Sequence, residues 1–160
     1  MKWFLLTLLL VGCAPHTRYF FCDLIPVYNN NKSILDACEE YRLAVERKDV
    51  DALMLTAHKQ YWDRGRPTGT EGYGYDGLRN VLLTRFQNTS EIGYAMRYEK
   101  VHQQCPVDLQ PGCRAMVEVL VDASWSIVDA FGKPVRMDKR DQNQLELEWD
   151  GRRWLFLSGY

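Results

Sequence analysis

The spacing of apolar residues along the chain changes near Asn88. Before this position they recur every three or four places, the spacing that lines one face of an α-helix. After it they recur at every second place, as in a strand with one buried face. The change predicts an α+β domain in which helices come first and then pack on one face of an antiparallel sheet.

Three helices are expected before Asn88. The first begins with Ser33 as its N-cap, and its apolar face consists of Ile34, Cys38, Tyr41 and Val45. Asp49 caps a second, short helix, and Asp76 caps a third. The glycine-rich residues 64–75 are predicted to form a loop between the second and third helices.

The remainder of the chain is expected to form the sheet. Residues 92–98 and 115–127 alternate between apolar and polar positions, and Asp150-Gly151 is a hairpin turn signal between two further strands. A two-residue loop there would place Leu147 opposite Trp154. Asp122 falls on the face opposite the apolar row and is expected outside the core.

Two leucines of the last strand fall on the face that points away from the predicted core. Leu155 and Leu157 alternate with Trp154 and Phe156, so burial of the latter pair would leave both leucines on the outer side. Exposed leucines on a sheet face are costly. They are therefore interface candidates, and a homodimer is one way to cover them.

The first thirteen residues have the layout of a bacterial lipoprotein signal. Lys2 precedes an apolar run, and Leu10-Val11-Gly12-Cys13 resembles a lipobox. The run of nine apolar residues would rise only about 14 Å as a helix, too short to span a bilayer. Residues 1–12 are thus expected to be removed and Cys13 to be lipidated. The alternative is an ordinary signal peptide with an accidental cysteine.

Lipidation would hold the mature chain at a membrane. Two or three acyl chains anchor a protein durably, at about 0.8 kcal/mol for each buried methylene. By resemblance to known bacterial sorting, Ala14 after the lipidated residue favours the outer membrane, with the domain facing the periplasm. Residues 13–32 form an aromatic-containing tether, and residues 33–160 form the folded domain.

Four cysteines remain after lipidation, and they allow three pairings. Cys105 and Cys113 are expected to form a disulfide, because the prolines between them suggest a loop whose ends return together. By elimination, Cys22 would pair with Cys38. A thiol or zinc site is the alternative, but there is no Cys-x-x-Cys and the spacings match no zinc pattern.

Charge and motifs exclude several classes of function. Without Lys2 the chain has 19 basic and 21 acidic residues and no basic stripe, so nucleic acid is not expected as a partner. The sequence contains no phosphate-binding glycine loop, nucleophile elbow or zincin motif. Neither a metal nor a cofactor is expected.

The order of elements resembles the nuclear-transport-factor-2-like (NTF2-like) superfamily, also called the cystatin-like cone fold, over residues 33–160. The resemblance rests on residues 49–53, 61–63, 74–79 and 149–154, which read DVDAL, YWD, GYDGLR and WDGRRW. It implies a curved sheet closed by helices around a conical pocket. Members include ketosteroid-isomerase-like enzymes, cyclases, dehydratases and non-catalytic binding modules, so the fold does not decide the function.

Enzymes of this superfamily commonly use an Asp or His base inside the cone with Tyr or Asp donors. The catalytic candidates here are His58 and Asp63, although each could instead serve as a helix or turn cap. The aromatic side chains expected to line the pocket could also belong to the core. They are Tyr61, Tyr73, Tyr94, Tyr98 and Trp125.

Two functions remain open from the sequence. The preferred one is a non-catalytic, lipid-anchored envelope protein that binds a small apolar ligand or a protein partner. The alternative is a tethered isomerase, cyclase or dehydratase that uses His58 and Asp63 as an acid–base pair in one cavity. An accessory role in a secretion or conjugation machine rests on fold analogy and location alone.

Overall fold

The computed structural model describes residues 29–64, 72–105 and 108–160. The predicted signal peptide, the lipidation site Cys13 and Cys22 lie outside the described residues, as does all but the end of the predicted tether. No helix in the described part of the chain is both long enough and apolar enough to cross a membrane.

Three helices precede the sheet, as predicted. They are α1 (Asn29–Glu46), α2 (Val50–Thr56) and α3 (Tyr75–Gln87). Asp49 caps α2 as expected, because its side chain accepts the N–H of Ala52. The other two predicted caps are wrong. Helix α1 begins before Ser33, and α3 begins after Gly74, so that Asp76 lies in its first turn.

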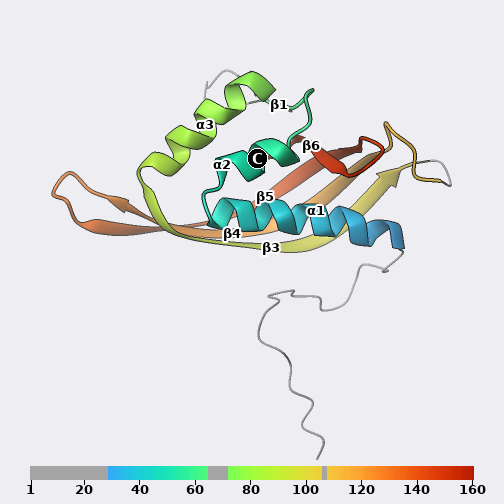
Figure 1. Cartoon of the computed structure of the whole chain (residues 1–160). Helices are drawn as coiled ribbons and strands as arrows, with labels where there is room; N and C mark the ends of the chain where they lie inside the picture. Colours follow the sequence, from blue (N-terminus) through green and yellow to red (C-terminus); the bar gives the residue numbers. More distant parts are fainter. Residues whose placement is uncertain (1–28, 65–71, 106–107) are drawn as a thin grey trace, which may run out of the picture.

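The main sheet has four antiparallel strands in the order β3-β4-β5-β6. They are β3 (Thr89–Gln104), β4 (Arg114–Val128), β5 (Pro134–Trp149) and β6 (Trp154–Ser158). The register between β3 and β4 shifts at two places, and such irregularities bend a sheet. All three helices lie on one side of this sheet (Figure 1). A separate two-stranded pair, β1 (Trp62–Asp63) with β2 (Tyr73–Gly74), precedes α3.

The core lies between the helices and the face of the sheet that they cover, which we call the inner face. Val117 and Val119 of β4 are fully buried on it, as is Ile34 of α1. The opposite, outer face carries most of the charged positions of β4. Asp122 lies there and is paired with Arg140 at 2.8 Å, as the alternation predicted.

The hairpin register differs from the prediction. The loop between β5 and β6 has four residues, 150–153, and Trp154 pairs with Trp149 instead of Leu147. The Asp150 side chain accepts the backbone N–H groups of both Arg152 and Arg153 and so stabilises the longer loop. Because the register is displaced by two positions, Trp154 and Phe156 still fall on the inner face and are buried.

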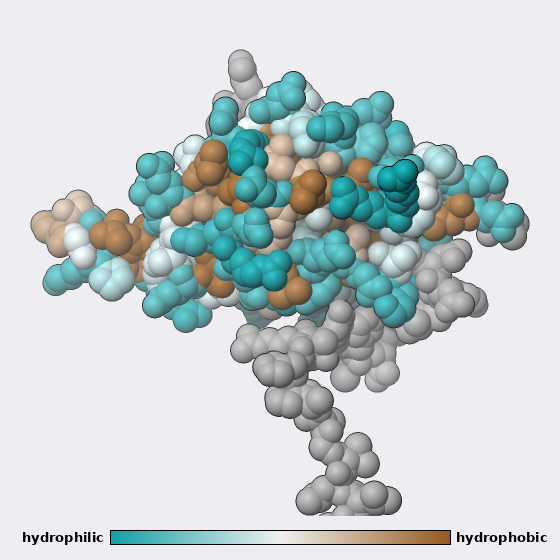
Figure 2. Space-filling view, in the orientation of Figure 1, coloured by the Kyte–Doolittle hydropathy of each residue, from teal (hydrophilic) through white to brown (hydrophobic). Residues whose placement is uncertain are grey.

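The far end of the β4–β5 hairpin extends beyond the helices (Figure 1). Residues 131–140 are all exposed, and Phe131 at the tip is 88% exposed. Apolar side chains gather at this end of the molecule (Figure 2). The sheet is therefore longer than the helical layer that covers it.

The C-terminal residues turn back into the core through Gly159, which has φ +102°. A Cβ at this position would lie 2.6 Å from the Gln144 carbonyl oxygen. We therefore expect Gly159→Ala to lower the free energy of unfolding by about 3 kcal/mol, through backbone strain and this collision. Chemical denaturation measures the loss.

Gly132→Ala is the matched control. Gly132 also has a positive φ (+77°), but a Cβ there meets no atom within 4 Å. Its cost should be confined to backbone strain of about 1 kcal/mol. Equal losses for the two variants would contradict the packing role of Gly159.

Candidate functional site

An open groove of about 2080 Å³ runs along the inner face of the sheet beside the helical layer, and its lining reaches around to Arg114, Glu146 and Leu157 of the outer face. The apolar wall of the groove includes Tyr94 of β3 and Trp125 of β4, with Leu82 and Phe86 of α3 across from the sheet. Val121 and Ala123 continue the wall along β4. The groove is thus a direct extension of the hydrophobic core, at the point where the helices stop covering the sheet.

A polar cluster lies on the groove beside α3. Strands β1 and β2 place Asp63 directly opposite Tyr73. The Tyr73 hydroxyl donates a hydrogen bond to Asp63 Oδ2 at 2.9 Å and accepts one from Arg85 Nη2 at 3.1 Å. All three residues line the groove. The cluster therefore offers a carboxylate, a phenol and a guanidinium to an occupant.

Burial shapes the acidity of the groove tyrosines. It raises the pKa of Tyr73 and of Tyr94, and in both cases the nearby Arg85 guanidinium opposes the shift. Both phenols are thus neutral at physiological pH. The Tyr73 hydroxyl already gives its single hydrogen to Asp63, so the donor that this cluster offers to a ligand is the Arg85 guanidinium.

Tyr160, which lines the groove, packs on the buried Tyr61. Their rings lie 5.0 Å apart, and the Tyr61 hydroxyl accepts the Tyr160 backbone N–H. The Tyr160 hydroxyl donates to the carbonyl of Leu53 at 3.1 Å and also contacts the Thr56 hydroxyl. Burial raises the pKa of both phenols. Sequence reasoning did not identify Tyr160, since a terminal tyrosine carries no distinctive pattern.

The structure divides the predicted pocket residues into two groups. Tyr73, Tyr94 and Trp125 line the groove. Tyr61 is 2% exposed and belongs to the core, and Tyr98 packs against the core without lining the groove. Tyr61 and Tyr98 thus follow the other possibility left open by the sequence, that these aromatic side chains belong to the core.

His58 does not share the groove with Asp63. Helix α2 ends before His58, whose backbone N–H donates to Phe156 while its Nδ1 accepts the N–H of Gln60. Its Nε2 lies 3.9 Å from Glu148 Oε1. The acid–base pair hypothesised from the sequence is therefore not assembled in one cavity. Arg85 is linked to Asp63 through the Tyr73 hydroxyl instead, and no sequence motif distinguished it from other helix cations.

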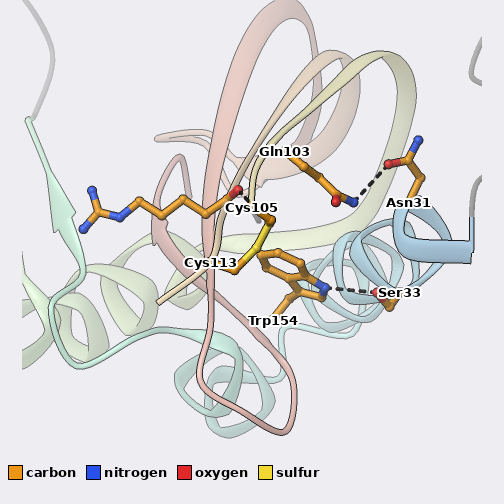
Figure 3. The surroundings of a disulfide bond; sticks show 7 residues. Asn31, Ser33, Gln103, Cys105, Cys113 and Trp154 are labelled. Carbon is orange, nitrogen blue, oxygen red and sulfur yellow. Dashed lines mark hydrogen bonds between the residues drawn. A yellow bond between two sulfur atoms is a disulfide. The ribbon is translucent and has the colours of Figure 1, made fainter. Parts of the chain in front are cut away.

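The predicted Cys105–Cys113 disulfide is present. It closes the β3–β4 loop beside two hydrogen bonds that tie α1 to the sheet (Figure 3). Trp154 Nε1 donates to the Ser33 hydroxyl at 3.0 Å, and the Gln103 amide donates to Asn31 at 3.1 Å. The disulfide thus lies at the end of the sheet where β3 ends and β4 begins. Of the described residues between Gln103 and Ala115, only Arg114 lines the groove.

The predicted pairing of Cys38 with Cys22 stays a prediction, because Cys22 lies outside the described residues. In the part of the chain that the structure describes, Cys38 is a free thiol, fully buried in the core on α1. Leu155 and Leu157 are partly exposed on the outer face, and Leu157 also contributes to the groove lining, so their role as an interface stays a prediction. Within the described residues, no group of three or more His, Cys, Asp or Glu could hold a metal ion.

Comparison with known proteins identifies the fold. No protein-family model matches the sequence, and no curated protein matches it. Among solved structures, a ketosteroid isomerase-like protein from Erwinia carotovora atroseptica has a TM-score of 0.65 at 21% identity. The match covers 82% of this chain and 95% of that chain.

Two further structures support the same assignment. A candidate dehydratase of the NTF2-like family from Streptomyces avermitilis has a TM-score of 0.63 at 12% identity, covering 82% of this chain and 94% of that one. A candidate scytalone dehydratase from Novosphingobium aromaticivorans has a TM-score of 0.63 at 13% identity, covering 82% and 81%. The domain therefore has the NTF2-like cone fold, with three helices on a four-stranded antiparallel sheet.

The state of Cys38 is directly testable. Burial raises the pKa of its thiol, so we expect an alkylating reagent to modify it only after the non-reduced chain is denatured. Peptide mapping by mass spectrometry without reductant reports the modification. Cys105 and Cys113 serve as controls and should stay unmodified in both states. A peptide in which Cys22 is linked to Cys38 would contradict the free thiol.

Proposed function

We propose that this protein is a lipid-anchored envelope protein whose cone domain binds a small, mainly apolar ligand in the groove. The observation that carries the proposal is the composition of the groove wall. Apolar side chains from β4 and α3 form a continuous surface, and the Asp63–Tyr73–Arg85 cluster adds a few polar groups beside it. Ligand sites of proteins commonly combine an apolar wall with a small number of polar groups that orient the ligand.

The proposed location rests on the N-terminal sequence. Lys2, the short apolar run and the lipobox-like residues ending at Cys13 support export and lipidation. Ala14 supports the outer membrane as the destination, with the domain in the periplasm. The Cys105–Cys113 disulfide agrees with an oxidising compartment.

A second candidate is an acid–base enzyme of the isomerase or dehydratase type. It is favoured by the position of Asp63, whose carboxylate lies on the groove in contact with a neutral phenol. A carboxylate can act as a general base, and the Arg85 guanidinium of the same cluster can stabilise a developing oxyanion. The names of two of the similar solved structures point to dehydratases. His58 has no part in this version of the mechanism.

The binding function is tested by filling the groove. Ala123 lies on the groove wall, so Ala123→Trp should reduce binding of the apolar probe 1-anilinonaphthalene-8-sulfonate about tenfold or more. Asp122→Trp places the same side chain on the outer face and should leave the affinity unchanged. Fluorescence titration measures both affinities. If the two variants bind the probe as well as the unaltered protein does, the groove is not the binding site.

The enzymatic candidate is tested with Asp63→Asn, which keeps the size of the side chain but removes its basicity. A 3-oxo-Δ5-steroid is a suitable first substrate, because its isomerisation produces a conjugated ketone with strong ultraviolet absorbance. If binding is the function, we expect no turnover above that of the Asp63→Asn variant. Turnover that falls about 100-fold or more in this variant would establish the enzymatic function instead.

A further inference from the structure

One edge of the main sheet is open along the outer half of β5. Strand β6 pairs only with residues 146–149 of β5, and beyond it the Asn143 amide donates to the Gly159 carbonyl. Within the described residues, no strand pairs with Pro134–Gln142 on this side. The edge of β6 itself is covered at one point by a bridge between Ala57 and Phe156. The open backbone edge thus belongs to the protruding hairpin.

The register between β4 and β5 determines which backbone groups face outward on this edge. The hydrogen bonds Asp129 N–H to Lys133 O and Trp149 N–H to Cys113 O mark hydrogen-bonded positions between β4 and β5. These positions recur at every second residue of an antiparallel pair. Odd-numbered residues of β5 therefore bond to β4, and the N–H and C=O groups of Arg136, Asp138 and Arg140 point away from it.

The side chains along the open edge are exposed on both faces. Val135 and Met137 lie on the inner face opposite Ile127 and Trp125 of β4, and they are 39% and 40% exposed. Arg136 and Asp138 lie on the outer face, where they pair with each other at 3.0 Å within the chain, and their side chains are 70% and 63% exposed. An exposed strand edge beside an uncovered apolar strip is a template for pairing with another strand.

We propose that two copies of this chain pair antiparallel along the open β5 edge, with Met137 next to the twofold axis. In an antiparallel pair that continues the sheet, this register places Arg136 opposite Asp138 of the partner subunit, and the reverse. Opposite charges that face each other across strands stabilise the pair. On the inner face, Met137 meets the partner's Met137, and Val135 meets the partner's Lys139.

Charge complementarity selects this register among its neighbours. An axis at Arg136, Lys139 or Arg140 would place that cation against its own copy. An axis at Asp138 would oppose two aspartates and also place Arg136 against Arg140 of the partner subunit. Like charges directly opposite are destabilising. The same residues that discourage general aggregation of an exposed edge thus permit one specific pairing.

The paired segment is short, so we expect a dimer that depends on concentration. Arg136→Asp places two negative charges opposite each other, because position 136 faces Asp138 of the partner subunit. Asp138→Arg places two positive charges opposite each other in the same way. Each should weaken dimerisation about tenfold or more. The double variant Arg136→Asp with Asp138→Arg restores opposite charges and should return to within about threefold of the unaltered protein. Sedimentation equilibrium of the full-length chain in detergent measures the dissociation constant of each dimer. Arg152→Asp, which lies in an exposed loop, is the control and should leave this constant unchanged.

Cysteine crosslinking tests the register itself. Directly opposite residues at non-hydrogen-bonded positions have Cα atoms about 4.5 Å apart, within the range that a disulfide spans. Met137→Cys should therefore form a disulfide-linked dimer under mild oxidation, above the background of the unaltered chain. Val135→Cys or Lys139→Cys alone should not, but the two variants produced together should link to each other.

Three outcomes would overturn the proposal. One is a monomer at every concentration without crosslinking through Met137→Cys. Another is crosslinking through Lys139→Cys alone that equals the crosslinking through Met137→Cys, because that result requires a different register. The third is a dimer that withstands the charge reversals but dissociates in Leu155→Asp, because that result would place the interface on the outer face of the sheet.

Discussion

Burial of one apolar row on β4 is the constraint on which the rest of the structure depends. The row runs from Ala115 to Ile127 at every second residue. Helices α1 and α2 cover its first half, where Val117 and Val119 are fully buried, and each such side chain contributes about 1.5–3 kcal/mol. The second half continues past the helical layer. The core, the groove and the open hairpin are thus three consecutive environments of a single strand.

The difference in length between β4 and the helical layer also explains why the sequence predicted the fold better than the site. Periodicity depends on which face is buried, so it identified three helices, the long strands and the outward position of Asp122. It does not report how far along a strand the burial extends. Trp125 and Val119 have equivalent places in the pattern, yet Trp125 lines the groove and Val119 lies in the core.

The local predictions that were wrong have a common physical cause, which is competition between a short-range sequence signal and a tertiary contact. Ser33 has a good N-cap side chain, but its hydroxyl accepts a hydrogen bond from Trp154 on the sheet. Asp150-Gly151 is a strong signal for a two-residue turn, but the Asp150 carboxylate caps two further backbone N–H groups and lengthens the loop. Those hydrogen bonds also lower the pKa of Asp150. His58 is held by backbone bonds to β6, which nothing in its neighbourhood indicates.

The two proposed surfaces meet at one pair of side chains. Trp125 lines the groove, and its direct neighbour across the strands is Met137, which lies next to the proposed twofold axis. A ligand against Trp125 and a second chain against Met137 would therefore cover adjacent parts of the same apolar strip. A ligand that touched both Trp125 and the second chain would bind more tightly to the pair than to one chain, because it would remove more apolar area from water. By reciprocity, the same contact would make pairing more favourable when the ligand is bound.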